Sequence, residues 1–159
     1  MKSVFFNSYE IKMIIYDFDG VMTDNKVLVN EEGVEMVAVH RGDGLAIGML
    51  REKGMTQMIV STEHNKVVSQ RANKLKIPVV QGVNDKAEAV IKICDEKNIS
   101  LKHIMYIGND LNDKEVMSIV GVRGCPADAE KEIVEISEWV SKRCGGDGVI
   151  RDLLDSLLF

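Results

Sequence analysis

Met13-Ile14-Ile15-Tyr16-Asp17-Phe18-Asp19-Gly20-Val21-Met22-Thr23-Asp24 is the stretch that tells most about the fold of this chain. A short apolar run bounded by polar and glycine residues is typical of a buried strand. Three carboxylates follow that run within eight residues. Because like charges so close together repel one another, we expect a cation beside them, and a hard divalent metal ion suits carboxylate oxygens.

Similar apolar runs recur along the chain and alternate with stretches of helical period. Further strands are predicted at residues 57–60, 78–80, 103–107 and 121–122, and helices at residues 44–53, 66–76, 86–97, 113–119 and 129–136. Right-handed crossovers between such elements give a parallel sheet with helices on both faces. The sequence therefore predicts an α/β fold, a Rossmann-like three-layer parallel sheet without a cap domain.

Residues 26–39 interrupt this alternation. Two apolar-alternating runs, 26–29 and 34–39, flank the turn Asn30-Glu31-Glu32-Gly33, which is typical of a β-hairpin. Its apolar side chains either pack on their own domain or are buried in a neighbouring subunit. The sequence leaves both alternatives open.

Composition narrows the classes of function. A chain of 159 residues with 45% hydrophobic residues and no linker is expected to form one domain over residues 1–159. The net charge of -5 argues against a nucleic-acid or anionic membrane partner. Met1-Lys2-Ser3-Val4-Phe5-Phe6-Asn7 lacks the long apolar core of a signal peptide, and the three cysteines are widely spaced, so we expect a cytoplasmic protein.

A second group of oxygen-bearing side chains, Gly108-Asn109-Asp110-Leu111-Asn112-Asp113, follows another predicted strand. The carboxyl ends of parallel strands meet at one edge of a sheet, so this group is expected to lie beside Asp17 and Asp19. Ser61 follows a third strand, and Lys86 begins a helix. A hydroxyl group, a helix N-terminus and an ammonium group are what a bound phosphate needs.

These motifs, in this order and spacing, resemble the four motifs of the haloacid dehalogenase superfamily. The resemblance is strongest to its capless subfamily, which contains 3-deoxy-D-manno-octulosonate 8-phosphate phosphatases and the phosphatase-like domain of acylneuraminate cytidylyltransferases. Four further stretches support it: His40-Arg41-Gly42-Asp43-Gly44-Leu45-Ala46-Ile47, Ser61-Thr62-Glu63-His64-Asn65, Arg71-Ala72-Asn73-Lys74-Leu75 and Gly145-Gly146-Asp147-Gly148-Val149-Ile150-Arg151.

The resemblance implies a Mg²⁺-dependent phosphatase that works through an aspartyl-phosphate. Asp17 would be the nucleophile, and Asp19 would protonate the leaving group and then activate water. Asp17, the backbone carbonyl of Asp19 and Asn109 would hold Mg²⁺. Ser61 and Lys86 would bind the phosphoryl oxygens.

The chain departs from the family pattern at two positions. Asn109 stands where the family usually has aspartate, which removes one negative charge from the metal site and leaves Asp110 or Asp113 as alternative ligands. Thr62 stands where relatives often have glycine, and a β-branched residue resists positive φ there.

The resemblance also bears on substrate and assembly. In the family, hairpins build a homotetramer and neighbouring subunits cover the site. Glu63 favours a nonulosonate 9-phosphate over an octulosonate 8-phosphate as the sugar-acid substrate, with Lys74 facing the sugar carboxylate and Arg71 reaching across a subunit boundary. Without the resemblance, the sequence indicates equally well that Glu63 is a charge at the N-terminus of a helix, and it indicates that Arg71 is a solvated helix residue. The first alternative function is a catalytically weak tetramerising module associated with a cytidylyltransferase. A receiver-like phospho-acceptor domain ranks last, because it does not explain Asp19 or the hairpin.

Overall fold

The computed structural model describes residues 10–158. Its strands are β1 (Met13–Tyr16), β2 (Leu28–Val29), β3 (Glu35–Met36), β4 (Thr56–Val60), β5 (Val79–Val80), β6 (Ile104–Ile107), β7 (Val122–Cys125) and β8 (Trp139–Val140). Its α-helices are α1 (Arg41–Glu52), α2 (Lys66–Leu75), α3 (Lys86–Lys97), α4 (Lys114–Ile119), α5 (Lys131–Ile136) and α6 (Val149–Leu158), with 3-10 turns at Leu101–His103 and Leu111–Asp113.

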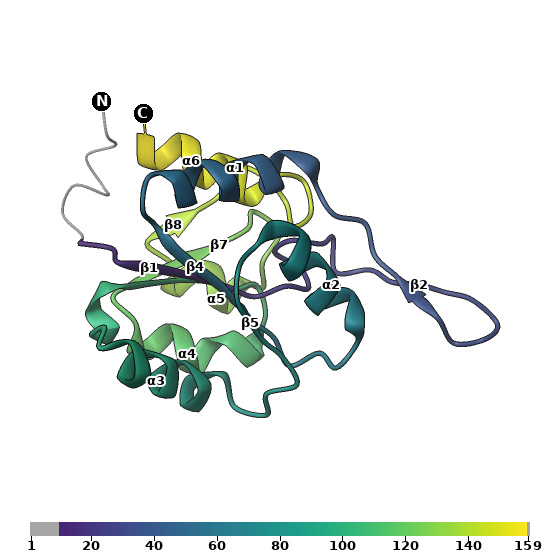
Figure 1. Ribbon diagram of the computed structural model, residues 1–159, viewed down its shortest axis with the longest axis horizontal. Coiled ribbons are helices and arrows are strands. Elements are labelled where there is room, and N and C mark those ends of the chain that lie inside the picture. The colour runs from purple at the N-terminus through teal and green to yellow at the C-terminus, as the bar shows by residue number, and fades with distance from the viewer. Residues whose placement is uncertain (1–9, 159) are drawn as a thin grey trace.

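A six-stranded parallel sheet forms the centre of the molecule, in the order β5-β4-β1-β6-β7-β8. Helices α1, α2 and α6 lie over one face, and α3, α4 and α5 over the other (Figure 1). Side chains of β1 alternate between the two apolar cores, since Ile14 and Tyr16 pack into one and Met13 and Ile15 into the other. Strands buried on both faces read as continuous apolar runs, which is why the sequence predicts β1 and β6 well. The Rossmann-like three-layer fold is confirmed.

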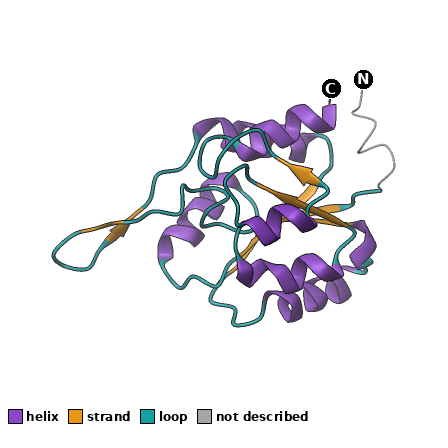
Figure 2. Ribbon diagram, turned by 180° about the vertical axis from the view of Figure 1, so that it is seen from behind, coloured by secondary structure: helices purple, strands orange, loops and turns teal. Residues whose placement is uncertain are grey.

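The order of the strands decides where the polar residues meet. Because β1 lies between β4 and β6, the residues that follow these three strands share one edge of the sheet. Figure 2 shows the same layers from behind, with loops crossing this edge.

Several element boundaries differ from the sequence prediction. The first helix begins at Arg41 rather than residue 44, because the His40 side chain accepts a hydrogen bond from Gly42 N and caps it. The strand predicted at residues 121–122 runs from Val122 to Cys125. The sequence does not predict strand β8, since two residues are too few to show a period.

The hairpin is shorter than predicted, and it projects from the body of the molecule (Figure 1). Only Leu28 with Met36 and Val29 with Glu35 pair across it. Val37 and Val39 at its base pack against the core, whereas the apolar side chains further out are exposed. Packing within the domain therefore accounts for the base of the hairpin and not for its outer part.

The residues 1–7 on which the expectation about a signal peptide rests lie outside the described part of the chain. Within residues 10–158, no helix has the length and apolar character needed to cross a membrane.

Candidate active site

The first carboxylate of the site, Asp17, directly follows β1. Its backbone N–H donates to the carbonyl of Ile107 at 2.9 Å, which extends the pairing of β1 with β6. Its Oδ1 accepts from the backbone N–H of Phe18 at 2.8 Å, and the residue is 5% exposed. Asp17 is therefore held at the edge of the sheet by its own strand.

The turn after Asp17 makes close contact with the segment 108–113. Gly20 has a φ of +82°, and a Cβ there would collide with the side chain of Asn109. Thr23 Oγ1 accepts from the backbone N–H groups of Gly20 and Asn25, each at 3.2 Å. Glycine at position 20 thus allows both the turn and the close approach of Asn109.

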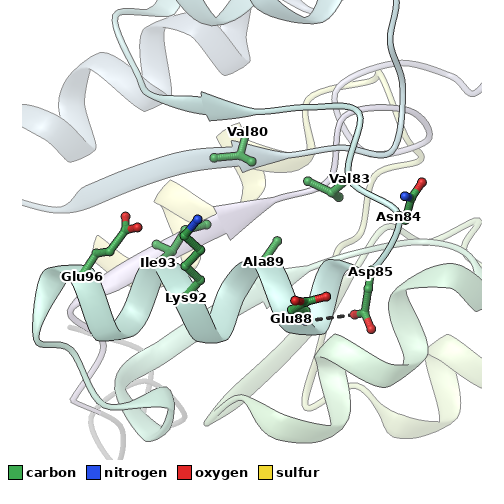
Figure 3. Close-up of a pocket in the computed structure, with 9 residues that line it drawn as sticks. All are labelled: Val80, Val83, Asn84, Asp85, Glu88, Ala89, Lys92, Ile93 and Glu96. Atoms are coloured by element: carbon green, nitrogen blue, oxygen red, sulfur yellow. Dashed lines mark hydrogen bonds between the residues drawn. The ribbon is translucent and has the colours of Figure 1, made fainter.

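Lys86 joins two carboxylates beneath the turn. Asp85 caps α3 by accepting from the backbone N–H of Glu88 at 2.9 Å (Figure 3). The next residue, Lys86, is 3% exposed, and its Nζ lies 3.0 Å from Asp17 Oδ2 and 2.7 Å from Asp113 Oδ1. The start of α3 therefore brings one ammonium group to two buried carboxylates.

Asp113 accepts hydrogen bonds from several groups of the site. It is fully buried, and its Oδ1 also accepts from the Tyr106 hydroxyl at 2.8 Å. Its Oδ2 accepts from the backbone N–H groups of Asn109 at 2.9 Å and Asp110 at 3.3 Å. Both oxygens are thus occupied by donors within the protein, so Asp113 fixes the segment that carries Asn109.

The charges of this cluster are unbalanced, because Asp17 and Asp113 share one Lys86. Burial, followed by the charge of Asp113, raises the pKa of Asp17 to about 8, although Lys86 acts in the opposite direction. Burial disfavours the charged form of Lys86, but Asp17 and Asp113 together raise its pKa. A second cation beside Asp17 would keep its carboxylate ionised at neutral pH.

Asp19 lies two residues on and is half-buried. Burial raises its pKa above the usual range, and the negative charges of Glu63 and Glu35 act in the same direction, while Lys86 opposes them. A carboxyl group with a raised pKa is suited to donate a proton near neutral pH.

Ser61 follows β4 and is 1% exposed. Its backbone N–H donates to Val80 O at 2.9 Å, and its carbonyl accepts from Val83 N–H at 3.2 Å. Its Oγ accepts from the backbone N–H of Glu63 at 3.1 Å. This accepted bond leaves the hydroxyl hydrogen of Ser61 free to donate to another group.

A cavity of about 70 Å³ collects the motif residues at this edge of the sheet. It is lined by Asp17, Asp19, Asn25, Ser61, Thr62, Asn109, Asp110 and Asn112. The structure thus brings together Asp17 and Asp19, two of the three carboxylates of the first motif, with Ser61 and with Asn109 of the last motif. Of the two alternative ligands, Asp110 lines this cavity, whereas Asp113 lies beneath it.

Two further observations concern a metal ion. Asn109 Oδ1 is buried and has no hydrogen-bond partner among residues 10–158. In that same part of the chain, no three His, Cys, Asp or Glu side chains are grouped so that they alone could hold a metal. A metal ion here would need the amide of Asn109 and backbone or solvent oxygens in addition to carboxylates.

Two of the residues assigned to substrate or subunit contacts lie elsewhere. Arg71 and Lys74 line a separate cavity of about 470 Å³ between α1 and α2, together with Arg41, Arg51 and Lys76. None of the residues that line the small catalytic cavity lines this basic one. Glu63 lies nearer to the motifs, where its Oε1 accepts from the backbone N–H groups of His64 at 2.8 Å and Asn65 at 2.9 Å.

A third cavity, of about 410 Å³, lies along α3 beside the edge strand β5 (Figure 3). Val80, Val83 and Ile93 supply apolar surface, and Glu88, Lys92 and Glu96 supply charge. None of the motif residues Asp17, Asp19, Ser61, Lys86 or Asn109 lines it. Asp17, Asp19, Ser61 and Asn109 line the small polar cavity instead.

The sequence assigned no individual role to three residues that make hydrogen bonds around the site: Glu35, Asn65 and Tyr106. Asn65 could have been found as a capping residue ahead of a helical stretch. Tyr106 reads only as part of an apolar strand. The contact of Glu35 with Asn65 spans 30 residues and leaves no local signal.

Comparison with known proteins gives a consistent picture. A family model described as haloacid dehalogenase-like hydrolase matches residues 50–153. The 3-deoxy-D-manno-octulosonate 8-phosphate phosphatase of Yersinia pestis is 32% identical over 149 residues, which cover 93% of this chain and 80% of that protein. N-acylneuraminate cytidylyltransferase A of Danio rerio is 24% identical over 150 residues, which cover 93% of this chain and 35% of that protein.

A solved structure is similar over nearly the whole chain. It is the 3-deoxy-D-manno-octulosonate 8-phosphate phosphatase of Moraxella catarrhalis, in complex with a magnesium ion, a phosphate ion and a KDO molecule. The TM-score is 0.91 at 28% identity, covering 97% of this chain and 89% of that one. The resemblance drawn from the sequence motifs is confirmed.

Proposed function

This chain belongs to the haloacid dehalogenase-like hydrolase family and is a phosphatase, and we propose that it hydrolyses the phosphate monoester of a 2-keto-3-deoxy sugar acid through an aspartyl-phosphate. The observation that carries this proposal is the contact of Lys86 with both Asp17 and Asp113, together with the small cavity that Asp17 and Asp19 line. We also propose that residues 1–159 act as a single cytoplasmic domain.

In this mechanism Asp17 attacks phosphorus and Asp19 protonates the leaving alkoxide. The raised pKa of Asp19 suits the proton donor of that step, and the same carboxylate then removes a proton from the attacking water. The Ser61 hydroxyl donates to a phosphoryl oxygen. Lys86 Nζ, 3.0 Å from Asp17 Oδ2, is near enough to an oxygen of a phosphoryl group on Asp17 to stabilise its charge.

The site also fits Mg²⁺. The buried Oδ1 of Asn109, which has no hydrogen-bond partner among residues 10–158, is an available oxygen ligand, and a further cation beside Asp17 would favour its ionised form. Asp17, the Asp19 carbonyl and Asn109 would hold the ion, with Asp110 as an additional carboxylate. When bound, Mg²⁺ offsets the repulsion between the carboxylates and an anionic substrate.

We propose a nonulosonate 9-phosphate as the preferred substrate, with an octulosonate 8-phosphate next. Glu63 supports the first, because in the resembling family this position tends to be glutamate in the nine-carbon branch and arginine in the eight-carbon branch. The named activities of the Yersinia pestis and Moraxella catarrhalis relatives support the second.

The basic cavity supports a role for a neighbouring subunit. Arg71 and Lys74 do not line the catalytic cavity of their own chain, yet a sugar-acid carboxylate needs cationic partners. We propose a homotetramer in which the exposed hairpin packs between copies and the basic cavity of one copy serves the site of another.

A second candidate function rests on Asn109. Its neutral amide supplies one negative charge fewer than an aspartate, which weakens the attraction for Mg²⁺. With weak catalysis, this chain would act as a tetramerising module bound to a cytidylyltransferase. The N-acylneuraminate cytidylyltransferase A of Danio rerio supports this alternative, because it contains a region similar to this chain.

Phosphate release from a panel of sugar phosphates, with and without Mg²⁺, tests the proposal. We expect selective, Mg²⁺-dependent hydrolysis of a nonulosonate or octulosonate phosphate. Asp17→Asn should lower kcat by about 10³-fold or more, because an amide cannot act as the nucleophile. Thermal unfolding of both proteins controls for folding. A folded Asp17→Asn protein with unchanged turnover would overturn the mechanism, and absence of turnover by the natural chain would favour the assembly module.

A further inference from the structure

We propose that Glu35, on the exposed hairpin, is a positioning residue that fixes the phosphate-binding turn after β4. This inference deepens the proposed phosphatase function and rests on it. The feature that carries it is a hydrogen bond from Asn65 Nδ2 to Glu35 Oε2 at 3.1 Å, between residues 30 positions apart.

Glu35 differs from its neighbours on the hairpin. Val34 is 53% exposed and Met36 is 56% exposed, whereas Glu35 is half-buried. Alternate residues of a strand point to opposite sides, so Glu35 faces the body of the molecule while the apolar neighbours face away from it. The strand thus directs its one carboxylate toward the N-terminus of α2.

Asn65 has both ends of its amide occupied. Its Oδ1 accepts from the backbone N–H of Val67 at 3.0 Å and caps α2, and its Nδ2 donates to Glu35. Because the oxygen is fixed by the helix, the amino group must point to the hairpin. This orientation leaves the Glu35 carboxylate as the acceptor that matches it.

A continuous series of hydrogen bonds then leads from Asn65 to Ser61. The backbone N–H of Asn65 donates to Glu63 Oε1 at 2.9 Å, and the backbone N–H of Glu63 donates to Ser61 Oγ at 3.1 Å. Gln81 Nε2 supports the turn by donating to the carbonyls of Glu63 and Asn65 at 3.3 and 3.2 Å. Displacing Asn65 therefore moves the residue that orients the Ser61 hydroxyl.

Glu35 in this way couples the hairpin to the catalytic cavity without touching it. A hairpin held in place keeps Asn65, Glu63 and Ser61 in the arrangement that leaves the serine hydroxyl hydrogen for a phosphoryl oxygen. Because this series of hydrogen bonds ends at Ser61, binding of phosphate is the quantity that the coupling should change most.

Reversal of donor and acceptor tests the coupling directly. Asn65→Asp keeps an oxygen to cap α2 but sets a second carboxylate against Glu35. Glu35→Gln alone keeps an amide oxygen that accepts from Asn65. In the double variant, the new amide on the hairpin would donate to the new carboxylate at the start of α2, so the bond returns with its direction reversed. Glu31→Gln, which changes an exposed carboxylate on the same hairpin, is the matched control.

We expect Asn65→Asp to weaken inhibition by inorganic phosphate about tenfold and to raise KM by a similar factor, with kcat changed less than about threefold. The double variant should recover most of this loss, and Glu31→Gln should show none. Equal phosphate inhibition in all variants, or a double variant as weak as Asn65→Asp, would overturn the proposal.

Amide hydrogen exchange separates this inference from the proposed activity. The N–H groups of Glu63 and Asn65 should lose protection when Asn65→Asp is introduced and regain it in the double variant, whether or not any sugar phosphate is hydrolysed. Unchanged protection in Asn65→Asp would reject the coupling. Lack of turnover in the natural chain, with the exchange pattern as expected, would reject the phosphatase assignment alone.

Discussion

Residues at the carboxyl edge of the sheet bury polar groups, whereas residues of the hairpin expose apolar ones. At the edge, Asp113 is fully buried and both of its oxygens accept hydrogen bonds. On the hairpin, Leu28 is 70% exposed and Val29 59% exposed. Each arrangement is costly by itself, because buried charge needs partners and exposed apolar surface needs cover.

The two regions differ in where the groups lie that offset these costs. The edge of the sheet contains its own partners for the carboxylates, in Lys86, Tyr106 and backbone N–H groups. The outer hairpin has no such cover within residues 10–158. At the edge of the sheet, the buried Asp113 therefore has its partners within one chain, while the hairpin is suited to contact another molecule.

Removing Asp113 should have the largest effect on folding. Asp113→Ala leaves the Tyr106 hydroxyl and the backbone N–H groups of Asn109 and Asp110 without their acceptor, so we expect a loss of about 3–5 kcal/mol in the free energy of unfolding. Urea unfolding measures this loss. Asp110→Ala is the control, since it removes the side-chain cap of the 3-10 turn Leu111–Asp113, which is partly exposed, and should cost about 1 kcal/mol. Equal losses in the two variants would contradict the central role of Asp113.

The sequence predicts much of this edge of the sheet because the signals there are local. Buried parallel strands are continuous apolar runs, and each motif residue directly follows one, so Asp17, Ser61 and Asn109 can be placed together from the sequence. The topology then needs only the right-handed crossover rule.

Contacts over long separations cannot be predicted in the same way. The bond between Glu35 and Asn65 depends on how the hairpin folds back, and the separate cavity of Arg71 and Lys74 depends on the packing of α1 against α2. Strand β8 escapes prediction because Trp139 and Val140 are flanked by polar residues on both sides. Local pattern carries no information about such tertiary contacts.

Asn109→Asp tests whether the edge of the sheet lacks a charge for its metal. The substitution keeps the shape of the side chain beside Gly20 and adds one negative charge where Oδ1 has no partner among the described residues. We expect the Mg²⁺ concentration for half-maximal activity to fall about tenfold. Titration with Mg²⁺ at constant ionic strength measures it, with Asn112→Asp, which adds the same charge at another position of the cavity lining, as the control. A larger Mg²⁺ requirement in Asn109→Asp would show that the amide is the better ligand here.

Leu28→Ser with Met36→Ser should have the smallest effect on the folded chain itself. The two side chains pair across the hairpin and are 70% and 56% exposed, so they contribute little to the core. We expect the free energy of unfolding of the separated chain to change by less than about 0.5 kcal/mol.

The same two substitutions should strongly weaken association between copies of the chain, because burial of these side chains between copies is what would stabilise an assembly. Sedimentation velocity should show the natural chain as an oligomer and the double serine variant as smaller species, with Glu31→Ser on the same hairpin unchanged. If the variant stayed assembled, the hairpin would not be the contact between copies. If it came apart and also lost phosphatase activity while keeping its helical circular dichroism, the site at the edge of the sheet would depend on the neighbour that the hairpin brings.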